Sequence, residues 1–574
     1  MTTVEPVNAE FDEALTMGSR QLRIEQRQAD SAEFRKSRGA FFTPESVCDF
    51  ISAWAIREPT DRVLEPSCGE AAFMLAATQR LAALGAKPAR MQVDGFEIHS
   101  ASATTARALL AERGVNARVQ VGDFLSTTPH SRYDAVTGNP PYVRFHDFSG
   151  QARSVAMEAA MRQGVRLSKL ASSWAAFVVH SSAYLSDTGR LGLVLPAELL
   201  SANYAGTVRR FLLERFASVS LITFEQPVFP GVMTESVLLL CDGRGGTDHF
   251  EVHQLRSVRD LVNLPVSSSF HPDNFEQKWT GALLHGGEAQ LSLDRLISSA
   301  SFGLLSDWGR VSLGAVTGNN GYFLLTPERA AKLGLGMYEL VRISPAGSRH
   351  LRSIRFTSSS LSSLGRQGLA TLLFRPANNP SGAARAYIRE GEASGVQEAY
   401  KCRVRSPWWR VPLVNVPDLF LTYMNADTPR LAVNEAKARH LNSVHGLYLN
   451  KELQPLRAAL AVASLNSATL LGAELVGRAY GGGILKLEPG EALHLPLPAP
   501  PLVARYKDEL LSLVPHLRAL LRSGRLLDAV SEVDAVILKR PRVIKVSELT
   551  SLRGAREHLA ARRLARSSPG ARVP

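Results

Sequence analysis

Two consecutive prolines, Pro140 and Pro141, follow an apolar run over residues 133–138 and constrain the fold more than any other feature of the chain. Neither a central strand nor a helix continues easily through two residues that lack a backbone N–H. The run is therefore predicted to be a strand that ends there, which leaves Asn139 and Tyr142 at its tip. In an open α/β sheet, ligands bind at the carboxyl ends of the strands.

An amide and a flat ring at a strand tip suit a planar amino group, such as that of a nucleobase or a glutamine side chain. The alternative is structural. In that interpretation the prolines form a turn, Asn139 caps a loop and Tyr142 is an ordinary core residue.

Strand and helix patterns alternate along the first 240 residues, which predicts βαβ units and a mostly parallel sheet. Thr43-Pro44 is expected to cap a helix that carries Val47, Phe50, Ile51 and Trp54. The predicted strands are 62–65, 91–97, 118–121, 133–138 and 191–196, with further apolar segments at 219–224 and 236–240. The predicted helices are 73–84, a second one through Leu110, 174–185 and 204–216.

Changes in composition divide the chain further. A glycine-rich joint at 242–246 ends the alternating pattern, and the region beyond it is poorly periodic, with short strand-like runs at 372–374, 410–414 and 419–421. A helical pair is expected at 453–475 and 502–521. The expected divisions are an N-terminal helical segment at 1–36, an α/β domain at 37–245, a connecting segment at 246–300, a mixed α+β domain at 301–540 and a basic tail at 541–574.

The charge balance points to a polyanionic partner. The chain has 574 residues and a formal net charge of +13, and for a protein of this size nucleic acid is the simplest such partner. Its four cysteines form no Cys-x-x-Cys pair, so no zinc ligand set of that kind is expected. The polar N-terminus and the lack of a long apolar stretch predict a soluble, cytoplasmic protein.

Acidic and small residues recur where the predicted strands end. Glu65-Pro66-Ser67-Cys68-Gly69 follows the first strand, Glu97 ends the second, and Asp123-Phe124 follows the third. An acidic side chain in such a place suits ribose hydroxyls, and a second can accept from an adenine amino group. Alone, Glu97 is more simply a solvated strand end, and the other two features are equally well a strand–helix turn or a cap followed by a core aromatic. Together the three describe a nucleoside bound across the sheet edge. Neither Gly-x-Gly-x-x-Gly nor Gly-Lys-Ser/Thr occurs, so a dinucleotide or triphosphate site is unsupported.

Five segments in one order resemble the gamma class of DNA adenine-N6 methyltransferases, the Taq-type enzymes of restriction–modification systems. The segments are Phe41-Phe42-Thr43-Pro44, Leu64 to Gly69, Gly95-Phe96-Glu97, Gly122-Asp123-Phe124 and Gly138 to Tyr142. The resemblance implies a Rossmann-like domain with a mostly parallel seven-stranded sheet, followed by a target recognition domain. It also implies a methyl group taken from S-adenosylmethionine, double-stranded DNA as partner and a separate cognate restriction endonuclease, with no metal in catalysis.

Carried onto this sequence, the resemblance implies that S-adenosylmethionine is held by Thr43, Glu65, Pro66, Gly69, Glu97, Asp123 and Phe124. It gives catalysis to Asn139, Pro140, Pro141 and Tyr142, with Tyr142 stacking on a flipped adenine and Phe229 covering the other face of that base. The segments 401–409 and 480–489 resemble elements of the recognition domain, although a packed tryptophan pair and a glycine turn explain them equally well.

Several rival functions need comparison with this pattern. Enzymes that methylate protein glutamine or ribosomal RNA also use Asn-Pro-Pro-Tyr, but they usually lack a large basic C-terminal domain. A non-catalytic DNA-specificity protein would not need intact Glu97, Asp123 and Asn139. Cytosine-N4 enzymes more often have serine in place of Asn139, and the Pro-Cys dipeptide of cytosine-C5 enzymes does not occur in this sequence.

Overall fold

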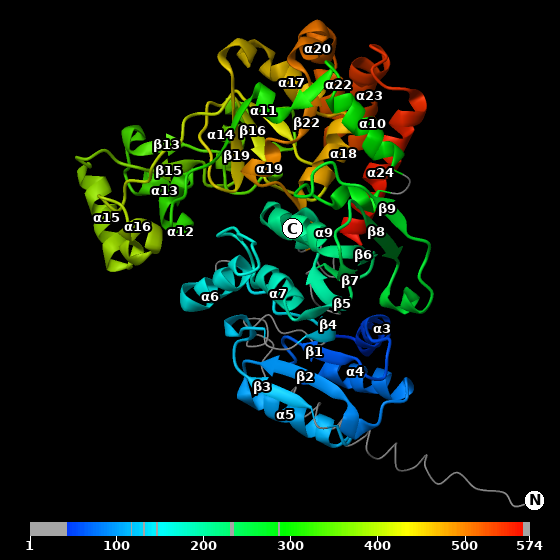
Figure 1. Ribbon diagram of the computed structural model, residues 1–574. Coiled ribbons are helices and arrows are strands. Elements are labelled where there is room, and N and C mark those ends of the chain that lie inside the picture. Colours follow the sequence, from blue (N-terminus) through cyan, green and yellow to red (C-terminus); the bar gives the residue numbers. More distant parts are fainter. Residues whose placement is uncertain are drawn as a thin grey trace, which may run out of the picture. The chain divides into compact units, whose positions relative to one another are not determined.

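The computed structural model describes residues 43–115, 117–129, 132–144, 147–229, 235–284, 287–480 and 482–565 (Figure 1). Its contacts divide the chain into two compact units, Met1–Leu283 and Leu284–Pro574. The N-terminal segment 1–36, expected to be helical, lies outside the described residues. The expected connecting segment at 246–300 contributes two strands to the first unit and a helix to the second.

Within the described residues, the first unit is built on one nine-stranded sheet with the order β3-β2-β1-β4-β5-β7-β6-β8-β9. The strands from β3 to β5 are mutually parallel, and β7 runs antiparallel between β5 and β6. The predicted α/β class is confirmed, and β8 and β9 extend the sheet beyond the seven strands expected. The bounds are β1 (Arg62–Glu65), β2 (Gln92–Glu97), β3 (Arg118–Val121), β4 (Tyr133–Gly138), β5 (Leu185–Pro196), β6 (Phe216–Phe224), β7 (Ser236–Arg244), β8 (Phe250–Leu255) and β9 (Ser268–Phe270).

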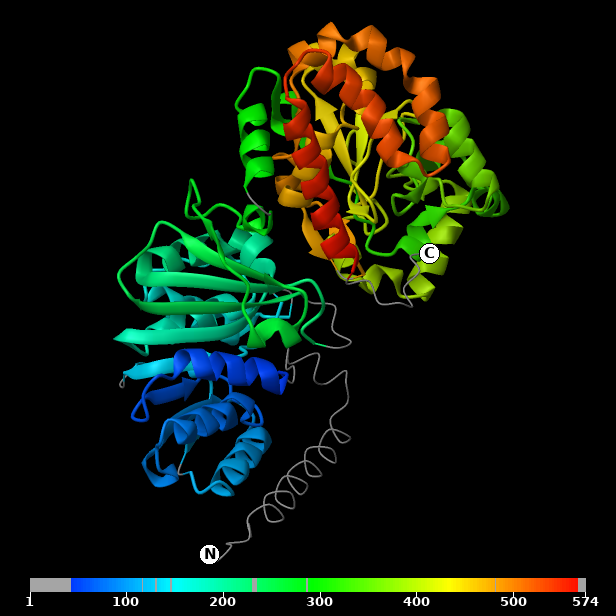
Figure 2. The ribbon, with the colours of Figure 1, turned by 90° about the vertical axis from the view of Figure 1, so that its right-hand side faces the viewer.

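Helices follow β1, β2, β4 and β5, as predicted (Figure 2). Each buries an apolar face: Leu75 and Leu81 on α4 and Leu109 on α5, for example, share one core cluster with Val63 and Val93 of the strands. Burial of each such side chain stabilises the fold by about 1.5–3 kcal/mol. The bounds are α3 (Glu45–Ala55), α4 (Ala72–Ala83), α5 (Ser100–Ala111), α6 (Gly150–Met161), α7 (Ser173–Ser182), α8 (Glu198–Ser201) and α9 (Gly206–Arg215).

The second unit mixes several small sheets with helices, which confirms the predicted α+β class. Its described strands form a five-stranded sheet of order β11-β19-β16-β18-β14, two three-stranded sheets and one two-stranded sheet. The bounds are β10 (Phe302–Leu304), β11 (Gly309–Leu313), β12 (Leu324–Leu325), β13 (Leu340–Arg342), β14 (Arg355–Phe356), β15 (Leu372–Phe374), β16 (Leu419–Thr422), β17 (Met424–Asn425), β18 (Leu431–Asn434), β19 (Val444–Leu449), β20 (Arg478–Tyr480), β21 (Ile484–Lys486) and β22 (Pro496–Pro498).

Two predictions of secondary structure in this unit need correction. The run 410–414 is not a strand, because Pro412 has no N–H to donate to a ladder, although Val411 is fully buried. The expected helical pair consists of shorter helices. The first member is broken between α17 (Arg457–Ala463) and α18 (Ser467–Val476), where the Asn466 side chain caps α18.

The helices of the second unit complete the architecture. They are α10 (Glu288–Ile297), α11 (Leu305–Trp308), α12 (Asn320–Phe323), α13 (Pro327–Lys332), α14 (Ser358–Arg366), α15 (Gly382–Ala393), α16 (Tyr400–Arg403), α17, α18, α19 (Pro489–Ala492), α20 (Pro500–Arg505), α21 (Lys507–Ser512), α22 (Val514–Arg522), α23 (Leu526–Asp534) and α24 (Val546–Leu564). No single described helix meets the length and hydropathy expected of a membrane span, whereas the segments Lys451–Ala463 and Ser467–Val476, bent by 89°, meet it as a pair.

The basic segment 541–574 contributes α24, which packs on α18 and α10. Arg563 forms a bidentate ion pair with Glu474, at 2.8 and 3.0 Å, and both side chains are less than 5% exposed. Its guanidinium also donates to the carbonyl oxygens of Ala426 and Asp427. These contacts give this arginine a structural role in the second unit.

Replacement of Arg563 by methionine is expected to lower the free energy of unfolding by about 3–5 kcal/mol, because it leaves the Glu474 carboxylate buried without its partner. Arg525→Met is the matched control, since its ion pair with Asp528 is exposed and is worth about 0–1 kcal/mol. Urea denaturation of the full chain measures both. Equal midpoints for the two variants would contradict this role.

Candidate functional site

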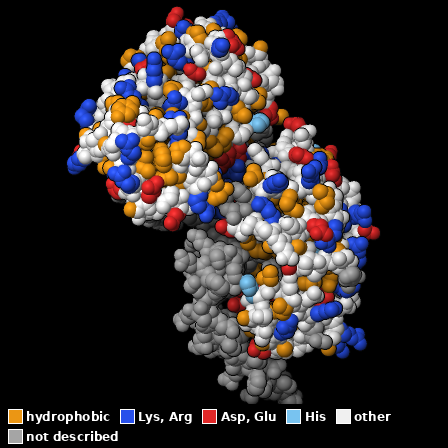
Figure 3. Space-filling view, turned by 90° about the vertical axis from the view of Figure 1, so that its left-hand side faces the viewer, with side chains coloured by type: hydrophobic (Ala, Val, Ile, Leu, Met, Phe, Trp, Pro, Cys, Tyr) orange, Lys and Arg blue, Asp and Glu red, His pale blue; other side chains and the backbone are white. Residues whose placement is uncertain are grey.

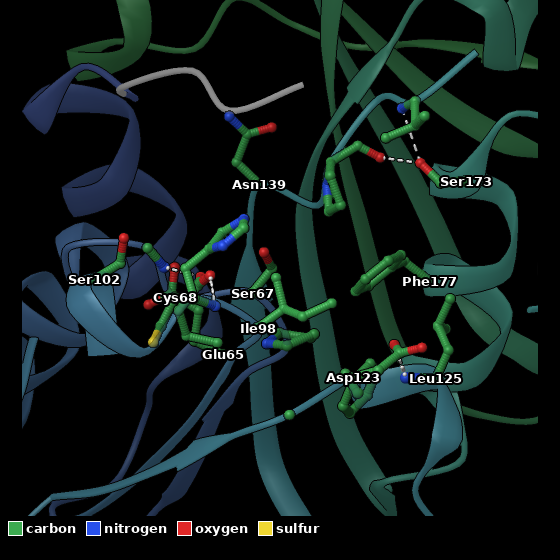
Figure 4. A pocket seen from close by; sticks show the side chains of 18 of the residues that line it. Glu65, Ser67, Cys68, Ile98, Ser102, Asp123, Leu125, Asn139, Ser173 and Phe177 are labelled. Carbon is green, nitrogen blue, oxygen red and sulfur yellow. Dashed lines mark hydrogen bonds between the residues drawn. The ribbon is translucent and has the colours of Figure 1, made fainter. Parts of the chain in front are cut away.

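A pocket of about 330 Å³ opens at the carboxyl ends of β1, β2 and β4 (Figure 4). It gathers side chains that are far apart in the sequence, because neighbouring parallel strands end at the same edge of the sheet. All seven residues expected to hold a cofactor line it, and so do Asn139 and Pro141: the seven are Thr43, Glu65, Pro66, Gly69, Glu97, Asp123 and Phe124.

Two carboxylates line this pocket and bind the backbone around it. Glu97 ends β2 and accepts from the backbone N–H of Gly69 at 2.8 Å and of His99 at 2.9 Å. It thereby ties the turn after β1 to the end of β2. Gly69 has φ +50°, a left-handed conformation that favours glycine. Glu65 ends β1 and accepts from the N–H of Met74 at 3.0 Å.

Burial raises the pKa of Glu65 well above its ordinary value, the N–H of Met74 opposes this shift, and the nearby Glu97 charge adds to it. Burial also raises the pKa of the Cys68 thiol, which lies in the same turn. A thiol held in its protonated form is a poor nucleophile. Cys68 is therefore a packing residue of the pocket, and covalent chemistry through its sulfur is disfavoured.

Apolar side chains form the walls on either side. The rings of Phe124 and Phe177 stack with centroids 5.8 Å apart, and Ile98 presents a side chain that is 62% exposed. Asp123 stands beside them and caps the 3₁₀ turn Phe124–Ser126 by accepting from the N–H of Leu125 at 3.0 Å. In Figure 4, Phe177 and Asp123 lie on one side of the pocket and Glu65 on the other. A flat heteroaromatic ring fits between such walls.

The sequence interpretation missed Ile98 and Phe177. Ile98 follows Glu97 directly, so an apolar residue next to an acidic strand end was the signal available. Phe177 lies inside a helix that is almost entirely buried, where nothing in the sequence distinguishes it from its core neighbours.

The amide of Asn139 is held from both sides. Its Oδ1 accepts from the Tyr142 hydroxyl at 2.7 Å, and its Nδ2 donates to the Thr43 hydroxyl at 3.1 Å. The Tyr142 hydroxyl also lies 2.9 Å from the carbonyl oxygen of Val194 on β5. Burial raises the pKa of Tyr142, so this hydroxyl keeps its proton and can donate.

The expected capping role of Thr43 is wrong. Pro44 occupies the N-cap position of α3, and no side chain there makes a capping hydrogen bond. The hydroxyl of Thr43 contacts Asn139 instead, because the start of α3 lies against the end of β4.

Ser173, at the start of α7, holds the loop that follows the prolines. Its hydroxyl donates to the carbonyl oxygen of Pro141 and accepts from the N–H of Val143 at 2.9 Å, and its own N–H donates to the carbonyl oxygen of Val143 at 3.0 Å. Sequence reasoning gave Ser173 no role. The serine fixes the backbone of the tetrapeptide that begins at Asn139.

Three predicted site residues do not line the pocket. Pro140 is buried, and the Tyr142 side chain is half-buried with its hydroxyl anchored as described above. Phe229 is 4% exposed and belongs to a core cluster with Val47 and Phe224. A role for Phe229 against a ligand therefore requires its ring to leave this cluster; Pro230 and Gly231 lie outside the described residues.

The second unit exposes basic side chains beside apolar ones. Tyr400 and Val404, at the two ends of the α16 turn, are 65% and 64% exposed. Figure 3 views the side on which α15 and α16 lie in Figure 1, where Lys and Arg side chains surround apolar patches. The exposed basic residues of these two helices are Arg385, Arg389, Lys401 and Arg403.

The other segment compared with a recognition domain, 480–489, contains the end of β20, the strand β21 and the start of α19. Lys486 lies 5.3 Å from the ring centroids of both Tyr423 and Tyr480. The tryptophans of the first segment, Trp408 and Trp409, are half-buried against a core cluster of this unit.

Two family patterns match the chain. The family described as N-6 DNA Methylase matches residues 28–248, and the family described as the C-terminal domain of Type II methyltransferase M.Eco57I matches residues 276–538. The first match contains the whole pocket, and the second contains most of the second unit.

Curated relatives include two Type II methyltransferases that align over most of their length. M.AccI of Acinetobacter calcoaceticus is 23% identical over 88% of this chain and 94% of that protein. M.XamI of Xanthomonas campestris pv. amaranthicola is 28% identical over 80% of this chain and 85% of that protein. A tRNA1(Val) (adenine(37)-N6)-methyltransferase of Aliivibrio fischeri is 23% identical, but over only 35% of this chain.

Among solved structures, the Type IIL restriction-modification enzyme MmeI in complex with DNA resembles this fold with a TM-score of 0.58. The alignment covers 90% of this chain and 75% of that chain at 12% identity. At this identity the likeness concerns the fold alone.

Glu65→Gln is expected to gain stability relative to the wild type as the pH rises. Because the folded state raises the pKa of Glu65, its carboxyl favours folding most below the unfolded pKa of about 4.3. That contribution is lost as the pH rises from there through the folded pKa, by about 1.4 kcal/mol per unit.

Melting temperatures at pH 5 and pH 8 measure this difference, with the exposed Glu58→Gln as control. Relative to wild type, the melting temperature of Glu65→Gln should be higher at pH 8 than at pH 5. The melting temperature of Glu58→Gln relative to wild type should be the same at both pH values. A pH-independent difference for Glu65→Gln would show that this carboxyl titrates normally.

Proposed function

Because the chain belongs to the N-6 DNA methylase family of Type II methyltransferases, we propose that it methylates N6 of an adenine turned out of double-stranded DNA. It is an adenine-specific DNA methyltransferase, and S-adenosylmethionine is its methyl donor. The proposal that the target is N6 of a flipped adenine depends on one observation. The Asn139 amide, hydrogen-bonded to Thr43 and Tyr142, lies at a strand tip beside a pocket whose size and lining suit S-adenosylmethionine.

The residues of the pocket fit the donor. Ile98, Phe124 and Phe177 provide flat apolar walls for an adenine ring, and Asp123 offers a carboxylate oxygen to its amino group. Glu97 would accept from the ribose hydroxyls with lone pairs that its backbone contacts leave available. Bound S-adenosylmethionine would supply an electrophilic methyl group and a positive charge.

The remaining predicted contacts also line the pocket. Thr43, Glu65, Pro66 and Gly69 would hold the amino-acid portion of the donor. A cation near Glu65 would favour its charged form, which burial otherwise opposes. The buried carboxyl is thus suited to a positively charged ligand.

Asn139 prepares the adenine nitrogen for attack. The exocyclic nitrogen is a poor nucleophile because its lone pair is delocalised into the ring. The Asn139 Oδ1 and the Pro140 carbonyl oxygen are the proposed acceptors for its two N–H groups. These acceptors stabilise the positive charge that grows on the nitrogen, and positioning supplies much of the remaining rate.

Tyr142 has two tasks in this proposal. Its ring stacks on the flipped adenine, an interaction worth about 1–3 kcal/mol. Its hydroxyl orients Asn139, because a donor on one lone pair of Oδ1 leaves the other lone pair for the substrate N–H. Phe229 would cover the second face of the base only after leaving its core position.

The second unit would grip DNA phosphates through exposed basic side chains and read base edges in the major groove. Methylation of the DNA sequence that this unit reads would protect the host DNA from a separate cognate restriction endonuclease acting on the same sequence. Catalysis by the residues named above requires no metal.

A methyltransferase of RNA or of protein glutamine is the alternative. The site itself does not discriminate, since an amide at a strand tip accepts from any planar amino group. The second unit favours DNA, because the match to an RNA-modifying relative covers only about a third of this chain.

Expression in a host without adenine methylation, followed by direct long-read sequencing of its DNA, tests the proposed reaction and substrate together. N6-methyladenine at every copy of one short sequence is expected, and none with Asn139→Ala. Unmodified DNA from cells that contain soluble wild-type protein would contradict the proposal.

Asn139→Ala is expected to lower the rate of methyl transfer by at least about 10²–10³-fold, the usual cost of removing one preorganised electrostatic group. Binding of DNA and of S-adenosylmethionine should stay within a few-fold of wild type. Transfer of labelled methyl groups to DNA and equilibrium titrations measure these quantities, with the exposed Asn203→Ala as control. Wild-type turnover would remove Asn139 from the mechanism.

Substitutions of Tyr142 separate the roles of ring and hydroxyl. Tyr142→Phe keeps the ring and loses one hydrogen bond, so kcat should fall by about 2–10-fold, corresponding to roughly 0.5–1.5 kcal/mol. Tyr142→Ala loses both and should reduce kcat more, while affinity for S-adenosylmethionine changes little in either variant. If Tyr142→Phe has the wild-type rate, the hydroxyl does not orient Asn139. If Tyr142→Phe and Tyr142→Ala have equal rates, the ring does not stack on the adenine.

A further inference from the structure

Two histidines face each other at the end of the last strand pair of the first sheet. Strands β8 and β9 are antiparallel with Phe250 opposite Phe270, so His249 and His271 continue the pairing by one residue. Their rings stack with centroids 4.9 Å apart and an interplanar angle of 29°. Phe250 and Phe270 pack on each other, with ring centroids 5.3 Å apart.

Strand alternation places the histidines and the phenylalanines on opposite faces of this strand pair. Phe250 packs against the buried Trp279, with ring centroids 4.2 Å apart. His249 and His271 are on the other face and are partly or fully exposed. The phenylalanine core thus fixes the backbone positions from which the imidazoles project.

Carboxylates complete the cluster. Asp248 Oδ1 lies 2.8 Å from His249 Nδ1, and Glu251 Oε1 lies 3.9 Å from His249 Nε2. One ligand atom from each of Asp248, His249 and His271 falls within 4.8 Å of the other two. In a tetrahedral zinc site with bonds of about 2.0–2.2 Å, ligand atoms lie about 3.3 Å apart, so small side-chain rotations suffice.

We propose that Asp248, His249 and His271 form a surface site for one Zn²⁺ ion. Two imidazoles with a carboxylate suit zinc, whereas Mg²⁺ and Ca²⁺ prefer oxygen ligands alone. Exposure of the cluster leaves a fourth position for water, and Glu251 adds negative charge nearby. The site is independent of methyl transfer, since β5, β7 and β6 separate it from β4 and its tip at Asn139.

The expected consequence is structural. β9 has only three residues and forms one edge of the nine-stranded sheet, where one side of the strand pairs with none of the described strands. A zinc ion that joins His271 to Asp248 and His249 would tie this strand to β8. An ion that binds only the folded state stabilises it. Once the ion concentration exceeds the dissociation constant, this stabilisation grows with the logarithm of the concentration.

Isothermal titration of the chelator-treated full chain with zinc chloride tests the proposal. One saturable site per chain is expected, with affinity at least about tenfold weaker in His249→Ala and in His271→Ala. His494→Ala, which removes an exposed histidine of the second unit, is the matched control and should bind like wild type. Zinc should also raise the melting temperature of the wild type but not that of the two variants.

Three results would overturn the site: no saturable binding, binding that neither substitution weakens, or equal competition by millimolar Mg²⁺. The substituted side chains are on the surface, so the variants should keep wild-type melting temperatures in chelator. Methyl transfer in chelator should be equal for wild type and variants, which separates failure of this proposal from failure of the proposed function.

Discussion

The proposed reaction depends on the orientation of one amide, that of Asn139. A free asparagine side chain rotates, and its oxygen and nitrogen present opposite hydrogen-bonding characters. Here the Tyr142 hydroxyl lies at Oδ1 and the Thr43 hydroxyl at Nδ2, so both ends of the amide are held at the strand tip. The prolines that follow remove backbone freedom, and Ser173 holds their loop from α7. The amide is thus positioned before any substrate arrives, as the proposed electrostatic catalysis requires.

The sheet turns this local constraint into a complete site. Parallel order places the ends of β1, β2 and β4 side by side, so Glu65, Glu97 and Asn139 reach one pocket although 74 positions separate the first from the last. The start of α3 adds Thr43 to the same edge. The pocket and the amide therefore depend on one backbone arrangement, and a shift of β4 against β1 would disturb both.

Much of this was predictable from the sequence because strand ends leave local signals. The double proline marked the tip of β4, and acidic residues marked the ends of β1 and β2. Contacts between distant segments left no such signal. The partnership of Thr43 with Asn139 joins positions 96 apart, Ser173 lies in an ordinary buried helix, and Phe229 occupies the core in the described state. Likewise, His249 and His271 meet only because β8 pairs with β9.

The most direct test of the oriented amide is a crystal structure of the full chain with its methylated DNA sequence and an unreactive analogue of S-adenosylmethionine. The account predicts an extruded adenine whose N6 lies within about 3.2 Å of Asn139 Oδ1, with the Tyr142 and Thr43 contacts to the amide retained. An adenine still stacked in the duplex, or an N6 bound by other groups while the Asn139 amide turns away, would contradict it.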